Sequence, residues 1–310
     1  MRSSLPIGIF SIVTAGGLLA ATTFAHAAAA TWVSGTGSDA GNCPITAPCR
    51  TFAYAHSQTN NNGSINVLTS GNFGPLTITK PISIVAEGVE AMINTGAGGA
   101  AITVNAGGAA VVSLRGLIID LRGTANDGIS FISGAALHVN NSMVRRATQG
   151  IKFAPASGVS ELYVSNAVIA DIGFIGVNVA PTGTASAKVL LERVQVENSA
   201  SDGILVRGDN TSGSVTAAVR DSVSSGNVAN GILAMFVVNV MVERSALVNN
   251  NRGITATGAG ATIRIGNSTV AGNANTGLLA FLGGVIESYG TNKVNGNGAD
   301  GAPTSTILKK

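Results

Sequence analysis

The chain has 310 residues, of which 41 are glycine, 45% are hydrophobic, 4% are aromatic and only 11% are charged. A globular chain averages about 25% charged residues, and disordered chains combine high charge with few β-branched residues, so this composition excludes intrinsic disorder. Eight prolines without a G-X-Y period exclude a collagen, and 18 basic against 15 acidic residues without a dense basic run argue against a nucleic-acid-binding protein.

Residues 1–30 have the features of a secretory signal peptide. Arg2 supplies a positive charge, residues 5–21 are nearly all apolar, and Ala25-His26-Ala27 has the small-x-small pattern of a cleavage site. Cleavage after Ala30 fits the same pattern, and an uncleaved membrane anchor is the alternative, since the apolar stretch is nearly long enough to span. The alanine-rich end of the segment favours cleavage, which predicts a secreted or periplasmic protein. No later stretch reaches 18 consecutive apolar residues, so no membrane span is expected after removal of the signal.

The two cysteines, Cys43 and Cys49, follow the signal segment and flank a short loop that contains two prolines. In an oxidising compartment such a pair is expected to form a disulfide. The alternative is a pair of metal ligands, but neither His56 nor His138 is placed as an obvious third ligand.

Short runs of aliphatic and β-branched residues, separated by glycine-rich turns, follow the cysteine loop. Runs of this kind predict short strands. They lie at residues 65–68, 76–78, 82–85, 101–104 and 111–114.

A repeat extends through the rest of the chain. A glycine followed by an aliphatic residue recurs every 22 to 28 residues, at Gly128, Gly150, Gly176, Gly203, Gly231, Gly253 and Gly277, and Gly301 closes the series. Each interval has three short apolar stretches and no stretch of helical period. Helical repeats are about 33 residues or longer, so the pattern predicts roughly ten coils of short strands, stacked about 4.8 Å apart.

Alignment on this repeat predicts columns of equivalent residues along the stack. One aliphatic column contains Leu114, Val139, Val164, Leu191, Val219, Val242, Ile265 and Tyr289, and a second contains Ile119, Val144, Ile169, Val196, Leu247, Val270 and Val294, with Ser224 as its polar member. Alternating charges predict two ladders of ion pairs, through Glu192, Arg220 and Glu243 and through Arg193, Asp221 and Arg244. Asparagines stand four residues before a repeat glycine in four successive coils, which predicts an amide ladder through Asn227, Asn249, Asn273 and Asn297.

The repeat and its columns resemble those of right-handed parallel β-helix proteins of the pectate-lyase-like superfamily. The entry segment is also similar to the start of many secreted β-helix proteins: it reads TWVSGTGSD at 31–39, PCRTF at 48–52 and INVL at 65–68. The resemblance covers residues 31–301 and implies an all-β fold with an N-terminal cap, in which a short helix near residues 52–57 covers the first coil. We expect one β-helix domain at 31–310 after the signal peptide at 1–30, with a cap at 31–63, coils at 64–301 and a tail at 302–310.

Candidate site residues lie between positions 115 and 152. This stretch is predicted to form a groove that binds an acidic polysaccharide. The alternative is a solvent-exposed face that binds no ligand. In a lyase or an epimerase, the catalytic residues would be Asp120 or Asp127 as acid or metal ligand, and Arg145, Arg146 or Lys152 as base or substrate-binding residue. Further substrate-binding residues would be Arg115, Arg122 and His138.

No cofactor is evident from the sequence, and Ca²⁺ is a possible cofactor only if the protein is a lyase. Asp127 and Asp202 lie three coils apart, about 14 Å, which is too far for one ion, so no metal ligands are assigned. The paired aspartates and the Gly-His-Gly motif of a hydrolase of this fold are absent from the sequence.

Residues 232–242 are too apolar for a coil with one solvated face. Some of Leu233, Met235 and Phe236 should therefore project outward, as a surface for another subunit or partner; packing of Phe236 into the core is the alternative.

Together these features predict an exported β-helix protein that contacts an extracellular or periplasmic acidic polysaccharide, and that is a lyase or an epimerase if it is an enzyme. The rival prediction is a non-enzymatic surface adhesin or structural rod, because fold alone does not imply an activity.

Overall fold

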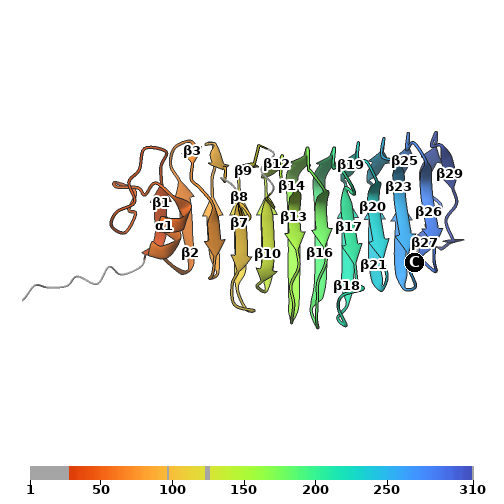
Figure 1. The fold of residues 1–310 in the computed structure, drawn as a ribbon, viewed down its shortest axis with the longest axis horizontal. Coiled ribbons are helices and arrows are strands. Elements are labelled where there is room, and N and C mark those ends of the chain that lie inside the picture. Colours follow the sequence, from red (N-terminus) through yellow and green to blue (C-terminus); the bar gives the residue numbers. More distant parts are fainter. Residues whose placement is uncertain (1–27, 96–97, 123–125, 309–310) are drawn as a thin grey trace, which may run out of the picture.

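The computed structural model describes residues 28–95, 98–122 and 126–308, which form an elongated rod of stacked coils (Figure 1). Equivalent short strands of successive coils pair in parallel, so three rows of strands follow the rod axis. The expected all-β parallel β-helix is confirmed, and the ten strands of one row agree with the expected number of coils. Among the described residues, no helix is both long and apolar enough to cross a membrane.

The three rows are named here in the order in which the chain visits them. Row 1 consists of β1 (Ala28–Val33), β2 (Thr59–Val67), β5 (Ile82–Val85), β8 (Val111–Arg115), β11 (Ala136–Asn140), the first halves of β14 (Val159–Ala170) and β16 (Ser186–Glu197), β18 (Val215–Arg220), β21 (Val238–Glu243), β24 (Ala261–Gly266), β27 (Val285–Ser288) and β30 (Ser305–Thr306). Row 2 consists of β3 (Gly71–Asn72), β6 (Ala91–Ile93), β9 (Leu117–Asp120), β12 (Met143–Arg145), the second halves of β14 and β16, β19 (Val223–Ser225), β22 (Ala246–Val248), β25 (Thr269–Ala271) and β28 (Lys293–Asn295). Row 3 consists of β4 (Leu76–Ile78), β7 (Ile102–Asn105), β10 (Ile129–Ser133), β13 (Gln149–Phe153), β15 (Ile175–Val179), β17 (Ile204–Arg207), β20 (Asn230–Met235), β23 (Arg252–Thr257), β26 (Thr276–Phe281) and β29 (Ala299–Gly301).

A left-handed backbone residue separates row 1 from row 2 in most coils. Asn141, Asp221 and Asn267 occupy this position with φ near 50°. Asparagine and aspartate tolerate this conformation better than other residues that carry a side chain, so the sequence places them where the coil must turn sharply. β14 and β16 each run through the bend as one strand, and their register omits only the bend residues Asn166 and Arg193.

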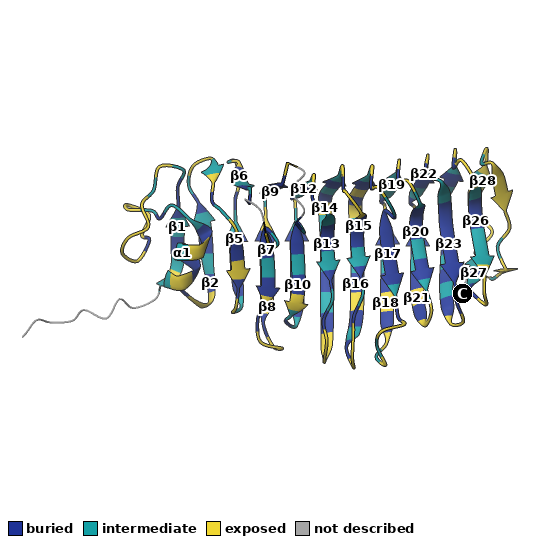
Figure 2. Ribbon diagram, in the orientation of Figure 1, coloured by how far each residue is buried: buried dark blue, intermediate teal, exposed yellow. Residues whose placement is uncertain are grey.

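The predicted aliphatic columns form the interior of the rod, and Figure 2 shows buried residues in the strands of every coil. Strand register confirms every member of the second column, including Ser224, and every member of the first except the last. Ser288, not Tyr289, lies opposite Ile265. The predicted column was wrong there because the coil between those two positions is one residue shorter than the alignment assumed, and Tyr289 lies outside the core.

The asparagine ladder is present, but its second member is Asn250 and not the predicted Asn249. The side-chain amide of Asn227 donates to Oδ1 of Asn250 at 2.8 Å, Asn250 donates to Asn273 at 3.2 Å, and Asn273 donates to Asn297 at 2.7 Å. Each of these oxygens also accepts the backbone N–H of the preceding ladder residue, at 3.0–3.1 Å. Asn249 is exposed and takes a left-handed conformation with φ of 58°.

The N-terminal end of the rod is closed by a cap. The helix α1 (Phe52–Gln58) begins after Thr51, whose side chain accepts the N–H of Tyr54, and it buries Phe52 against Phe73 with ring centroids 4.9 Å apart. The predicted disulfide between Cys43 and Cys49 is present in the loop between β1 and α1.

The predicted outward projection of the apolar stretch 232–242 is confirmed for Phe236, whose exposed fraction is 39%. Leu233 and Met235 are half-buried on β20. Phe236 and Val237 form the turn between β20 and β21, and Val237 is the more exposed of the two, at 65%.

Candidate functional site

One cluster of charged residues lies at the C-terminal ends of two row 2 strands, β9 and β12. It consists of Asp120, Arg145 and Arg146, and we call it the two-arginine site. Asp120 is the last residue of β9, Arg145 is the last residue of β12, and the parallel register places them side by side in neighbouring coils. Arg146 follows in a left-handed conformation with φ of 55°, and its side chain also reaches Asp120.

The carboxylate of Asp120 is almost fully buried, with 3% of its side chain exposed, and both guanidinium groups bind it. Nε of Arg145 donates to Oδ2 at 3.0 Å, and Nε of Arg146 donates to Oδ1 at 2.8 Å. Nη2 of Arg146 donates to Oδ2, and the backbone N–H of Arg122 donates to Oδ1 at 3.3 Å. The bond from Arg146 is the main reason that the pKa of Asp120 lies below its usual range; burial opposes this shift, while Arg122 and Arg145 contribute to it.

The arrangement suits anion binding better than proton transfer. A carboxylate whose pKa is lowered by two guanidinium groups cannot donate a proton at neutral pH, and Asp120 raises the pKa of Arg146 further, so this arginine cannot accept one. Two cations share one buried anion in the site, and Asp171 of the next coil also lies close enough to raise the pKa of Arg146. The arginine side chains are 41% and 45% exposed, and within the described residues Nη1 of each has no protein partner.

Two other predicted site residues lie at row 3: Lys152 is in β13, and Asp127 precedes β10. Nζ of Lys152 is 3.9 Å from Oδ2 of Asp127, and Gln149 donates to Oδ1 of the same aspartate at 3.3 Å. The side-chain amide of Asn178 continues this polar strip by donating to Gln149 at 2.6 Å.

The remaining predicted residues are also separated. Arg115 ends β8 on row 1 and pairs with Glu87 at 3.1 Å, in an exposed ion pair. His138 projects from row 1 as expected and stacks on Tyr163, with ring centroids 4.8 Å apart. Arg122 is exposed and takes a left-handed conformation after β9. The stretch 115–152 therefore does not form one groove; it contributes to three faces of the rod.

The aspartates named from the sequence do not fit a calcium ion, which requires six to eight oxygen ligands. Both oxygens of Asp120 accept bonds from arginine, and Asp127 is bound by Gln149 and Lys152. Over residues 28–95, 98–122 and 126–308, no three His, Cys, Asp or Glu side chains are grouped so as to hold a metal ion.

Sequence reasoning missed a polar cluster on row 1. The hydroxyl of Tyr163 donates to Glu161 at 2.6 Å, and Lys188 of the next coil lies 3.3 Å from the same carboxylate. The alternation of Glu161 and Tyr163 along β14 was the available signal, since alternate residues of a strand face the same side.

The sequence matches no protein-family model. It matches no curated protein sequence either. The structure is similar to pectate lyase Pel9A, with a TM-score of 0.51 and 14% identity over 90% of this chain and 78% of that one. It is also similar to the enzymatically active domain of bacteriophage CBA120 tailspike protein 2, with a TM-score of 0.52 and 10% identity over 84% of this chain and 44% of the tailspike chain, so it spans less than half of that chain. The A-module of the Azotobacter vinelandii mannuronan C-5 epimerase AlgE4 matches with a TM-score of 0.43 and 12% identity, over 80% of this chain and 91% of that one. At such identities the similarity to the pectate lyase and to the tailspike domain shows the fold alone, and the chain has a parallel β-helix fold.

Proposed function

We propose that the protein is exported and binds an acidic polysaccharide, with the two-arginine site as its main contact for a carboxylate. The observation that carries the proposal is the pair of guanidinium groups held in place by one buried aspartate. Arginine binds carboxylates with two parallel hydrogen bonds, and a guanidinium that is already fixed loses little conformational entropy when it binds.

The structural neighbours support this ligand class at the level of fold. The name of one describes an enzyme that acts on pectate, an acidic polysaccharide. The stacked coils also suit a polymer, because they repeat similar surfaces along the axis.

We expect Arg146→Gln to weaken the binding of oligogalacturonate and oligomannuronate at least tenfold. A charge-assisted hydrogen bond contributes about 1.5–3 kcal/mol, and each 1.4 kcal/mol corresponds to a factor of ten in affinity. Isothermal titration calorimetry measures the change, and the difference between wild type and variant should shrink as salt is raised.

Arg244→Gln is the matched control. Arg244 also takes a left-handed conformation and binds an aspartate of the preceding coil, Asp221, at 2.8 and 3.0 Å. Its ladder and the adjacent one are linked by ion pairs and together contain three arginines and three carboxylates, so its loss should leave uronate affinity within a factor of two. Equal losses in both variants, or no uronate binding by the wild type, would contradict the proposal.

Turnover is tested separately from binding. Formation of unsaturated product from pectate, alginate or hyaluronan, with and without calcium, would identify a lyase, and a change in the NMR spectrum of mannuronan would identify an epimerase. Binding without either reaction would favour the adhesin. Because Asp120 and Arg146 are unsuited to proton transfer, we expect any catalytic base to lie outside the two-arginine site.

We expect the signal peptide to be removed after Ala27 rather than after Ala30. Ala28 to Ala30 lie in β1, and Ala30 pairs with Ser64 of β2, so the later cut would remove three paired or strand residues that the earlier cut keeps. N-terminal sequencing of the exported protein should give Ala28 as the first residue. A start at Thr31, or an uncleaved chain, would contradict this expectation.

A further inference from the structure

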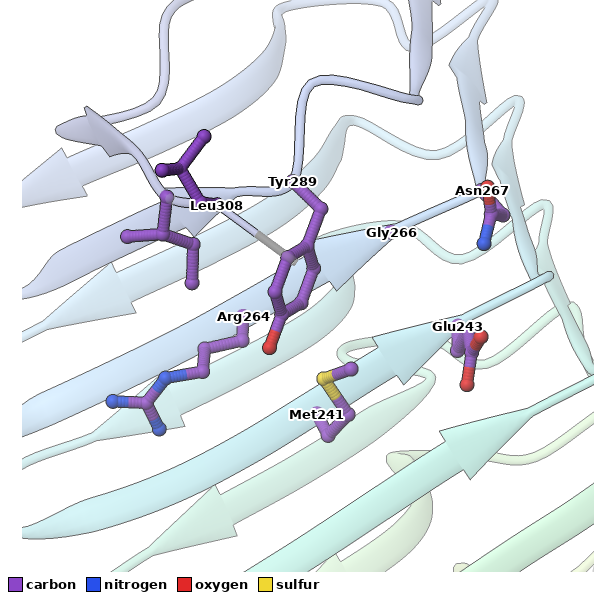
Figure 3. A pocket seen from close by; sticks show the side chains of 8 residues that line it. Met241, Glu243, Arg264, Gly266, Asn267, Tyr289 and Leu308 are labelled. Carbon is purple, nitrogen blue, oxygen red and sulfur yellow. The ribbon is translucent and has the colours of Figure 1, made fainter. Parts of the chain in front are cut away.

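A cavity lies far from the two-arginine site, on the outer face of row 1 at the C-terminal end of the rod. It has a volume of about 740 Å³. Figure 3 shows the ring of Tyr289 in the middle of this pocket, with Leu308 on one side and Met241 on the other. The pocket combines one aromatic face, an aliphatic wall and a polar margin.

Tyr289 lies in this pocket because of the strand register. Ser288 fills the core position opposite Ile265, so Tyr289, the next residue, lies beside Gly266 of the preceding coil. A Cβ atom on Gly266 would be only 3.1 Å from Cδ2 of Tyr289. The absence of a side chain at position 266 therefore leaves room for the ring to lie against the strand.

The C-terminal segment forms the wall of the pocket. β30 pairs with β27, and the backbone N–H of Ile307 donates to the carbonyl of Ser288 at 2.9 Å. These bonds hold Ile307 beside the ring. Leu308 follows at the open margin of the pocket, with 88% of its surface exposed.

The charged groups of the pocket are paired within the protein. Nε of Arg264 lies 2.7 Å from Glu287, and Glu243 lies 3.0 Å from Arg244. Among the described residues of the pocket, each cation is therefore balanced by a neighbouring carboxylate. The polar groups can still exchange hydrogen bonds with hydroxyl groups, and Asn267 adds an amide at the margin.

We propose that this pocket is a subsite for an uncharged pyranose unit, with one face of the sugar stacked on Tyr289 and its hydroxyls hydrogen-bonded to Arg264, Glu243 and Asn267. Pyranose rings combine an apolar C–H face with a polar edge, which matches an aromatic platform bordered by polar groups. The inference rests on the proposed polysaccharide-binding function and adds that the ligand contains neutral sugars as well as acidic ones.

The experiment uses protein labelled with 3-fluorotyrosine, because the chain has only three tyrosines and the ¹⁹F spectrum should show three assignable signals. The probes are hexamers of β-1,4-linked glucose, mannose and galactose, and oligogalacturonate. We expect at least one neutral hexamer to shift the Tyr289 signal while the signal of Tyr54, in the cap, stays unchanged. An unmoved Tyr289 signal with all three neutral hexamers would overturn the proposal without use of any variant.

Two variants separate this proposal from the proposed function. Tyr289→Ala and Gly266→Val should each weaken neutral-hexamer binding at least tenfold and leave uronate binding at the two-arginine site unchanged, whereas Arg146→Gln should do the reverse. If both pocket variants still bind the neutral hexamers, the subsite proposal is overturned. Loss of uronate binding by Arg146→Gln would in that case still support the proposed binding of acidic polysaccharide at the two-arginine site.

Discussion

Replacement of Asn250 by alanine is expected to lower the free energy of unfolding by about 4 kcal/mol. Its Oδ1 accepts the backbone N–H of Asn227 at 3.0 Å and the side-chain amide of Asn227 at 2.8 Å, and its own amide donates to the carbonyl of Ser224 at 3.0 Å. Only 2% of Asn250 is exposed, so water cannot replace these bonds. Each buried group left without a partner costs about 1–3 kcal/mol, and the substitution removes the acceptor of the backbone N–H of Asn227 and of one side-chain N–H. The side-chain amide of Asn227 keeps its other bond, to the hydroxyl of Ser224 at 3.0 Å.

Urea unfolding of the exported protein measures the effect, as a lower midpoint with an unchanged slope. Asn249→Gly is the control, since Asn249 is exposed and glycine adopts its left-handed conformation freely. We expect this variant to stay within about 0.5 kcal/mol of the wild type. Similar losses at positions 249 and 250 would show that the amide ladder does not stabilise the rod.

The error over Asn249 shows which part of the fold the sequence leaves ambiguous. The prediction counted four residues back from each repeat glycine, and this spacing holds for Asn227, Asn273 and Asn297. In the coil of Gly253 the turn is one residue shorter, so Asn250 takes the ladder position. The sequence has asparagine at both 249 and 250, and only the hydrogen bonds between coils decide between them. The strand rows were easier to predict. The alternation of apolar and polar residues along each strand and the repeat along the chain both indicate the same residues as facing the core.

The candidate site was harder to predict for a geometric reason. One coil takes about 25 residues, so a stretch as long as 115–152 passes all three rows and cannot form one patch. Residues meet when their separation is close to one coil, as for Asp120 and Arg145, which are 25 residues apart. The pair could have been identified from this spacing alone. The contact between Asp120 and its second partner, Arg146, could not be identified in this way, because it depends on the left-handed turn that follows β12.

Acidification from pH 7 to pH 4 is expected to lower the free energy of unfolding by about 2 kcal/mol through His56 alone. His56 lies in α1 with 8% of its surface exposed, and its Nε2 accepts the backbone N–H of Thr79 at 3.4 Å. Burial, followed by the positive charge of Lys80, lowers the pKa of His56 from 6.5 to about 4. Between these values the unfolded chain binds a proton that the folded chain does not. The contribution of His56 to the free energy of unfolding is therefore complete above pH 6.5 and is lost as the pH falls toward 4. The difference between the two pKa values corresponds to about 3 kcal/mol. Because the imidazole keeps some access to solvent, we expect a smaller loss of about 2 kcal/mol.

His56→Gln isolates this effect, because glutamine keeps an acceptor for Thr79 and does not titrate. The carboxylates that titrate near pH 4 are present in both proteins, so their contributions cancel in the difference between wild type and variant. Trp32 is the only tryptophan and lies in β1, next to α1, so its fluorescence reports on the cap. We expect the wild type to lose about 2 kcal/mol more than the variant between pH 6.5 and pH 4. Parallel pH profiles would refute the role of His56. A transition at Trp32 that precedes the loss of the β-sheet circular dichroism signal would show that the cap opens before the coils, as expected for a solenoid in which each unit contacts only its neighbours.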